Sequence, residues 1–411
     1  MSLRRGLAIS FLDQSLLSLA SFLVGLFLIR NTAKEQYGMY AVACAAVLFV
    51  VGVQNALVTT QMTVLAPRDD RGNRERFCAA LASGQYLILL PFLAAAFAAA
   101  AAARTAGLLD GNATLVILSV CAAVPGVMLR EFFRGYFFRL ARPTAVLAMD
   151  SLYLALLGAG LGFFAVVFPA GLHVTALLVT GAAALPAGFA ALFGAGMKPV
   201  FRLREISDAL IEVWAQGRWA LAGVMVTWLQ DQSYLYLLAA LAGAAETAEA
   251  SAARLFLAPA ALLNAGFARV LLPRWAALRR CGGEELIRSM ARKALGCMTG
   301  AIVAYAAIIL LVRDSLERLL GIRGYADLEA LVVLWSVLFV IQACRSVCSW
   351  MLQASCRFAP LARANAVSAV VVLLLGTILI GHFGARGSVL ALLVGEAVLM
   401  LLLWRSCRHA V

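Results

Sequence analysis

Long runs of apolar residues alternate with short, arginine-rich segments along the whole chain. The runs are continuously apolar and lack the two-residue alternation of a half-buried strand, so they predict helices. A helix needs about 20 mainly apolar residues to cross a bilayer. Twelve runs meet this requirement, at residues 7–29, 38–63, 77–103, 113–129, 143–167, 172–195, 218–242, 248–272, 290–312, 328–351, 360–381 and 387–404.

One segment of mixed polarity, KPVFRLREISDALIEVWAQGR, interrupts this series in the middle. Its apolar residues recur on one helical face and its charged residues on the others, which is typical of a helix lying on the membrane interface. The pattern predicts an all-α polytopic membrane protein of twelve transmembrane helices. We expect an N-terminal lobe of six spans (1–197), a cytoplasmic amphipathic linker helix (198–217) and a C-terminal lobe of six spans (218–411).

Composition supports a membrane protein, since 64% of residues are apolar and 13% are charged. A soluble domain is nearer half apolar and a quarter charged. The net charge of +13 comes from arginines in short loops, which favours lipid headgroups over nucleic acid as the partner. Of the 34 basic residues, 25 lie on the side of the N-terminus, so we predict that both termini are cytoplasmic.

Polar residues inside the first and seventh spans indicate a function. Gln14 lies on one stripe with Ser18 and Ser21, and Asp13 is beside it. Asp231 lies near the middle of the seventh span. A carboxylate costs a few kcal/mol at that depth, so it needs a partner, a proton or water.

The remaining intramembrane polar residues allow two interpretations. Asp150, Arg345 and Glu396 can pair with one another as structural contacts. Alternatively, polarity collects in spans one, two, seven and eight, the equivalent spans of the two lobes, and this predicts a water-filled central cavity between six-helix lobes.

The loops argue against an enzyme. The three histidines lie near span ends or in the tail, and the nine cysteines show no metal-ligand spacing. The sequence has no phosphate-binding glycine loop and no carboxylate pair at catalytic spacing. We therefore expect a transporter, with no cofactor and no metal site.

Three segments resemble the Wzx-like polysaccharide exporters of the multidrug/oligosaccharidyl-lipid/polysaccharide (MOP) superfamily. They are KEQYGMYAVA after Arg30, ARLFLAPAALLNAGFARVLLPRWA, and RFAPLARANAVSAVVVLLLGTILIGHFGARGSVLALLVGE. The resemblance implies alternating access around a cavity lined by spans one, two, seven and eight. It implies an undecaprenyl-diphosphate-linked oligosaccharide as substrate, flipped to the periplasmic leaflet of a bacterial inner membrane for exopolysaccharide, capsule or lipopolysaccharide O-antigen synthesis.

An arginine fork matches the phosphate oxygens of such a head group, although each arginine here could equally be an interface anchor or, for Arg345, half of a buried ion pair. A proton or sodium gradient would drive transport through the acids Asp13, Asp231 and Glu396. The residues expected to contact substrate are Arg30, Gln14, Asn55, Arg218, Asp231, Arg254, Asn264 and Arg345.

Two alternatives remain open. The first is a cation-coupled small-molecule antiporter of the related MATE class. It is supported by four intramembrane acids, Asp13, Asp150, Asp231 and Glu396. A non-transporting subunit that scaffolds a polysaccharide synthase is the other. For the leading hypothesis we expect a monomer whose partners are the lipid-linked glycan, the bilayer and the glycosyltransferases or polymerase of the same pathway.

Overall fold

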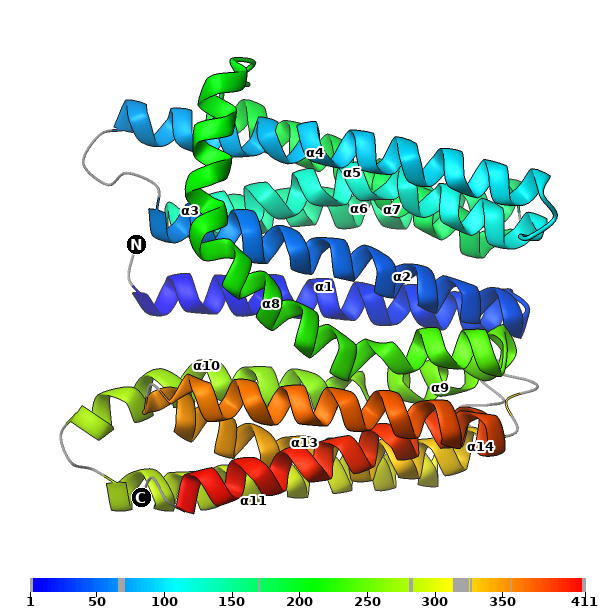
Figure 1. Ribbon diagram of the computed structural model, residues 1–411, viewed down its shortest axis with the longest axis vertical. Helices are drawn as coiled ribbons and strands as arrows, with labels where there is room; N and C mark the ends of the chain where they lie inside the picture. The colour runs from blue at the N-terminus through cyan, green and yellow to red at the C-terminus, as the bar shows by residue number, and fades with distance from the viewer. Residues whose placement is uncertain are drawn as a thin grey trace. The chain divides into compact units, whose positions relative to one another are not determined.

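A computed structural model describes residues 3–65, 71–168, 171–280, 284–312, 325, 327–355 and 357–408. All regular structure in these ranges is helical, and the helices form bundles of long rods (Figure 1). This confirms the predicted all-α class. Some loop arginines used for the orientation, including Arg68 and Arg318, lie outside the described residues.

The helices of the first half are α1 (Leu3–Asn31), α2 (Lys34–Gln54), the π-helix η1 (Asn55–Thr59), α3 (Thr60–Leu65), α4 (Arg71–Thr105), α5 (Gly111–Arg139), α6 (Pro143–Val167) and α7 (Leu172–Ala195). Those of the second half are α8 (Leu203–Leu241), α9 (Ala244–Phe256), α10 (Ala258–Arg280), α11 (Glu284–Leu311), α13 (Leu328–Ala354) and α14 (Phe358–Arg408).

The helices account for the predicted spans. Nine described helices are long and apolar enough to cross a membrane, and the pair α9–α10, bent by 54°, passes the same test when its two helices are taken together. Helix α14 is broken at Gly384 and so provides two spans rather than one. Helix α8 is long enough, at 39 residues, to cross the membrane after an interfacial segment. Each predicted span therefore corresponds to a described helix, part of one, or a helix pair.

The break in α14 has a specific acceptor. Gly384 has φ 53° and ψ −129°, a conformation that L side chains rarely adopt. The backbone N–H of Ala385, which starts the final helix, donates to the Glu246 carboxylate of α9 at 2.7 Å. A side chain on Gly384 would meet the same carboxylate, since an added Cβ would lie 2.5 Å from Glu246 Oε2.

The interfacial segment and the seventh span form one continuous helix. The sequence predicted a separate linker helix at 198–217, but α8 runs without interruption from Leu203 to Leu241. No proline lies in this range, and Gly217 and Gly223 are tolerated inside the helix.

Contacts divide the chain into two units. Unit 1 contains residues 1–24 and 42–224, and unit 2 contains residues 25–41 and 225–411. The end of α1 and the start of α2 thus belong to unit 2, where the Lys34 ammonium pairs with Glu249. The sequence-based boundaries at 197 and 218, and the central cavity, which concerns both units together, stay predictions.

Glycines bring α5 and α7 into close contact in unit 1. A Cβ added at Gly181 would lie 2.4 Å from Ala123 Cα, and one at Gly126 would lie 2.3 Å from the Gly181 carbonyl oxygen. Such small-residue contacts are the usual way for membrane helices to pack backbone against backbone. They fix the position of α5, which carries most of the buried charge in this unit.

Candidate functional site

Unit 1 contains a buried group of charged side chains, the α5 cluster, made by Asp13, Arg130, Glu131, Arg134 and Asp150. Helix α1 contributes Asp13, α6 contributes Asp150, and α5 contributes the other three. The two aspartates are each 1% exposed. Three carboxylates and two guanidiniums therefore share one region of low dielectric.

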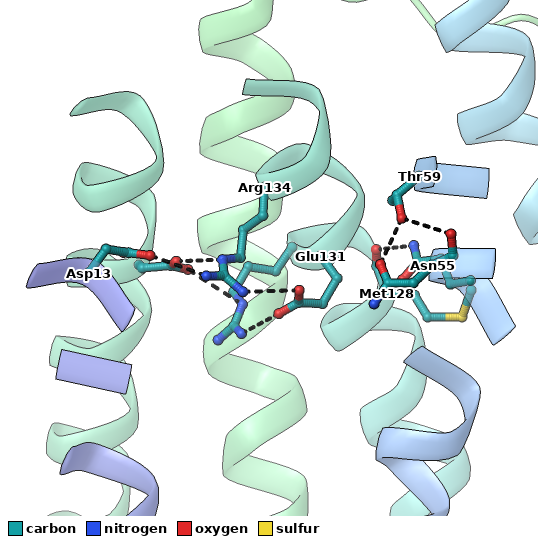
Figure 2. Close-up of polar contacts among 9 residues, drawn as sticks. Asp13, Asn55, Thr59, Met128, Glu131 and Arg134 are labelled. Atoms are coloured by element: carbon teal, nitrogen blue, oxygen red, sulfur yellow. Dashed lines mark hydrogen bonds and ion pairs between the residues drawn. The ribbon is translucent and has the colours of Figure 1, made fainter. Parts of the chain in front are cut away.

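Arg134 is the centre of the α5 cluster. Its Nη2 lies 3.1 Å from Asp13 Oδ2, its Nε lies 2.8 Å from Asp150 Oδ2, and its Nη1 lies 3.2 Å from Glu131 Oε2. Figure 2 shows the guanidinium of Arg134 between the carboxylates of Asp13 and Glu131. Removing one partner of such a buried network leaves uncompensated charge.

Arg130 completes the α5 cluster from one turn earlier on α5. Its Nη2 lies 2.6 Å from Glu131 Oε1, and its Nε lies 3.6 Å from Asp150 Oδ1. The guanidinium carbon lies 3.9 Å from the ring centroid of Tyr153, a cation–π contact. Both guanidiniums are therefore in contact with carboxylates.

The irregular segment of the second span is also in unit 1. The π-helix η1 begins at Asn55, whose side-chain oxygen accepts a 2.7 Å hydrogen bond from the Thr59 hydroxyl (Figure 2). Gln54 donates to Gln85 Oε1 at 2.9 Å and to the Met128 carbonyl at 2.7 Å. Single π turns are frequent at functional sites. The side-chain oxygen of Asn55, however, already accepts a hydrogen bond from Thr59 of the same π-helix.

Unit 2 contains a second buried group, the Glu396 cluster, made by Gln230, Gln342, Arg345 and Glu396. The carboxylate of Glu396 is 2% exposed and accepts from Gln230 at 3.3 Å, Gln342 at 3.2 Å and Arg345 Nε at 3.0 Å. The structural pairing expected for Arg345 and Glu396 is therefore present. Three donors from two other helices hold a single carboxylate.

Arg254 of α9 lies near this cluster but has a different environment. Its Nη1 donates to Gln232 Oε1 at 3.4 Å and to Tyr234 Oη at 3.2 Å, and its guanidinium carbon lies 5.5 Å from the Trp335 ring centroid. Among the described residues no carboxylate lies within ion-pair distance of it. Asp231 interacts with Arg254 electrostatically at longer range.

The structure places the sequence-predicted residues in separate environments. Asp231, Arg254, Arg345 and Glu396 come together in unit 2, since Asp231 also interacts electrostatically with Arg345 and Glu396. Asp13 and the half-buried Gln14 belong to unit 1, and Asn264 donates to Ser346 Oγ at 3.0 Å in unit 2. The side chains of Arg30, Asn55 and Arg218 are exposed.

Sequence reasoning missed three members of the α5 cluster. The fourth span was predicted at 113–129, and Arg130 and Arg134 were counted among cytoplasmic loop residues. Helix α5 continues to Arg139, and Arg130 is 8% exposed. The signal was present in REFFRGYFFR, where charges one and four positions apart are interleaved with aromatic residues.

No group of three or more histidine, cysteine, aspartate or glutamate side chains in the described ranges is arranged to hold a metal ion. The α5 cluster offers guanidiniums and carboxylates, and the Glu396 cluster offers a guanidinium, a carboxylate and two amides. These groups bind charged or hydrogen-bonding ligands and exchange protons.

In the described ranges, all regular structure is helical, most helices are long and apolar enough to cross a membrane, and each unit contains a buried charged cluster. No protein-family model and no curated protein sequence matches the chain. Solved structures do match: the lipid II flippase MurJ in an inward closed conformation has a TM-score of 0.76 at 11% identity, covering 98% of this chain and 87% of that one.

Two further structures agree. An inward-facing multidrug resistance MATE family transporter of the MOP superfamily has a TM-score of 0.73 at 14% identity, covering 95% of this chain and 94% of that one. A MOP superfamily transporter from Pyrococcus furiosus, described by the reverse polarity of its binding pocket, scores 0.65 at 13% identity over 98% and 94%. The chain therefore has the fold of the MOP superfamily transporters.

Proposed function

We propose that the chain flips an undecaprenyl-diphosphate-linked oligosaccharide from the cytoplasmic to the periplasmic leaflet of a bacterial inner membrane by alternating access. The fold shared with a lipid II flippase supports this proposal. The single observation that carries it is the environment of Arg254, a guanidinium bonded to neutral acceptors and to no carboxylate among the described residues.

Arg254 suits an anionic head group for physical reasons. A guanidinium that is already paired with a carboxylate, as in the α5 cluster, has little electrostatic gain from a phosphate. The Gln232 amide and the Tyr234 hydroxyl orient Arg254 without neutralising it. Its remaining N–H groups can then donate to two phosphate oxygens at once, in the geometry that a planar fork provides.

Asp231 and Glu396 supply the coupling in this proposal. Asp231 interacts with Arg254 through space, so a change in its protonation or a bound sodium ion alters the field at the phosphate site. No bond of the glycan is made or broken. The polar head follows charged side chains while the polyprenyl tail stays in lipid.

The test compares Arg254→Gln, which removes the charge, with Arg254→Lys, which keeps the charge and loses the fork. Proteoliposomes carrying a fluorescent undecaprenyl-diphosphate oligosaccharide report transfer between leaflets. Transfer should be lost in Arg254→Gln and partly kept in Arg254→Lys. The exposed Arg363→Gln on α14 is the matched control and should transfer normally. Normal transfer by Arg254→Gln would refute the proposal.

A second candidate, a cation-coupled small-molecule antiporter, is favoured by the excess of acid in the α5 cluster and by the fold shared with MATE transporters. Cells that lack the gene should then accumulate lipophilic cationic dyes. Unchanged dye accumulation together with lost surface polysaccharide would select the lipid-linked substrate instead.

A further inference from the structure

Unit 1 has an apolar groove of about 860 Å³ between three helices, which we call the α2–α4–α8 groove. Helix α2 and η1 form one wall, residues 85–93 of α4 form the other, and the first half of α8 crosses it. Two of its polar side chains, Gln54 and Gln85, bond to each other and leave the surface apolar. The groove thus offers contacts for hydrocarbon.

Two glycines explain why α8 crosses the groove without closing it. At one end α8 lies on α4, where a Cβ added at Gly84 would be 3.0 Å from Ile206 Cγ2. At the other end Gly217 of α8 lies against Leu57, at 3.1 Å from an added Cβ. Figure 1 shows α8 crossing α4 on its way to the end of the second span. Ile211 and Trp214 lie between these contacts, line the groove and are 67% and 51% exposed.

The groove has the length of one leaflet. Its lining on α4 runs from Gln85 to Leu93, which is about 12 Å at 1.5 Å per residue. Half of a hydrocarbon core of about 30 Å is similar. The groove begins at the amphipathic part of α8, the segment predicted to lie on the cytoplasmic interface. These dimensions favour one acyl chain over a much longer polyprenyl chain.

Exposed arginines of α8 lie beside the groove-lining side chains and can bind a phosphate. Arg204, Ile211 and Arg218 are spaced by seven residues and so share one stripe of the helix, beside the groove-lining side chains. All three are exposed. Neither arginine forms an ion pair in the part of the chain that the structure describes. An interfacial helix with basic residues on such an edge binds anionic lipid.

We propose that the α2–α4–α8 groove binds one acyl chain of an anionic phospholipid from the leaflet that borders the start of α8. Arg218, one turn after the groove-lining Trp214, holds its phosphate. Arg218, which the sequence suggested as a substrate contact, is here assigned to a lipid that is not transported. This site is independent of the proposed flippase activity, since it uses none of the residues near Arg254.

The test measures phosphatidylglycerol retained by the purified full chain in native mass spectrometry. Ile88 lines the groove and is 62% exposed, whereas Leu90, on the same helix and 54% exposed, does not line it. Ile88→Trp fills the groove and should lose the retained lipid. Leu90→Trp adds the same bulk outside the groove and should keep it. Equal retention by the two variants would overturn the proposal.

A second measurement tests the charge and the identity of the lipid. Arg218→Gln should weaken phosphatidylglycerol binding about fivefold and weaken phosphatidylethanolamine binding less, because the ammonium of that head group offsets its phosphate charge. If undecaprenyl phosphate displaces phosphatidylglycerol from the unsubstituted chain but does not bind Ile88→Trp, the groove holds the substrate's tail and the proposal is wrong. Because no transport is measured, failure here leaves the flippase proposal intact.

Discussion

The two buried charged groups differ in how completely they are satisfied. In the α5 cluster of unit 1, both guanidiniums contact carboxylates, and Arg134 alone contacts three. In unit 2, Arg345 is paired with Glu396, while Arg254 bonds to neutral acceptors. In a region of low dielectric, separating two paired charges is costly. A charge without a charged partner in the same region attracts an oppositely charged ligand strongly.

This difference separates a structural role from a binding role. A network whose charges are already paired inside one unit holds α1, α5 and α6 together. A guanidinium oriented by an amide and a phenol retains its charge for an incoming anion. An arginine therefore has different consequences at Arg134 and at Arg254, and substitutions distinguish the two by the ratio of lost stability to lost transport.

The largest effect on stability is expected for Arg134→Met. This substitution leaves the carboxylates of Asp13, Asp150 and Glu131 with less compensation in a buried site and should lower the free energy of unfolding by about 3 kcal/mol. Thermal unfolding of the purified chain measures it. Arg142→Met, at an exposed arginine just after α5, should change it by less than about 0.5 kcal/mol. Equal effects would mean that the α5 cluster is not structural.

An intermediate effect is expected for the pair Arg345 and Glu396. In a double-mutant cycle of Arg345→Met and Glu396→Gln, the unfolding free energies should show a coupling of about 1 kcal/mol, since the two groups lie 3.0 Å apart in a buried site. The exposed pair Arg202 and Glu205, 3.2 Å apart, is the control and should couple by less than about 0.5 kcal/mol. Similar coupling in both pairs would remove the distinction between buried and exposed contacts.

The smallest effect on stability is expected for Asp231→Asn, which removes a charge without breaking any hydrogen bond found within the described residues. We expect the free energy of unfolding to change by less than about 0.4 kcal/mol, which corresponds to a factor of two in the folding equilibrium. Protein abundance in the membrane should therefore stay within twofold of normal, and the same is expected for Arg30→Gln. Surface polysaccharide should be lost in both variants. Abundance and polysaccharide falling together would assign these residues to structure instead.

The sequence predicted the helices well because hydrocarbon runs are a one-dimensional signal. It also identified Asp13, Asp231 and Glu396 as unusual, since a carboxylate in an apolar run is conspicuous without any knowledge of its partner. The partners themselves are not readable in this way. Asp13 and Arg134 are 121 residues apart, and only packing brings them together.

The missed part of the α5 cluster has the same cause. A hydropathy boundary falls at the first charged residue, so the predicted span ends at residue 129 and leaves Arg130 in the cytoplasmic loop. In the fold, carboxylates from α1, α5 and α6 compensate the charges of Arg130 and Arg134, which allows α5 to continue to Arg139, nearly three turns beyond the predicted end. The unbroken α8 was missed because amphipathic and apolar patterns can succeed one another within a single helix.

The hydrogen bond from the Ala385 N–H, at the start of the final helix, to the Glu246 carboxylate joins segments that are synthesised at different times. The acceptor is synthesised 139 residues before the donor. Ala385 lies in the turn between the last two predicted spans, 360–381 and 387–404. When this turn is synthesised, the carboxylate that accepts from it already belongs to a helix that left the ribosome much earlier.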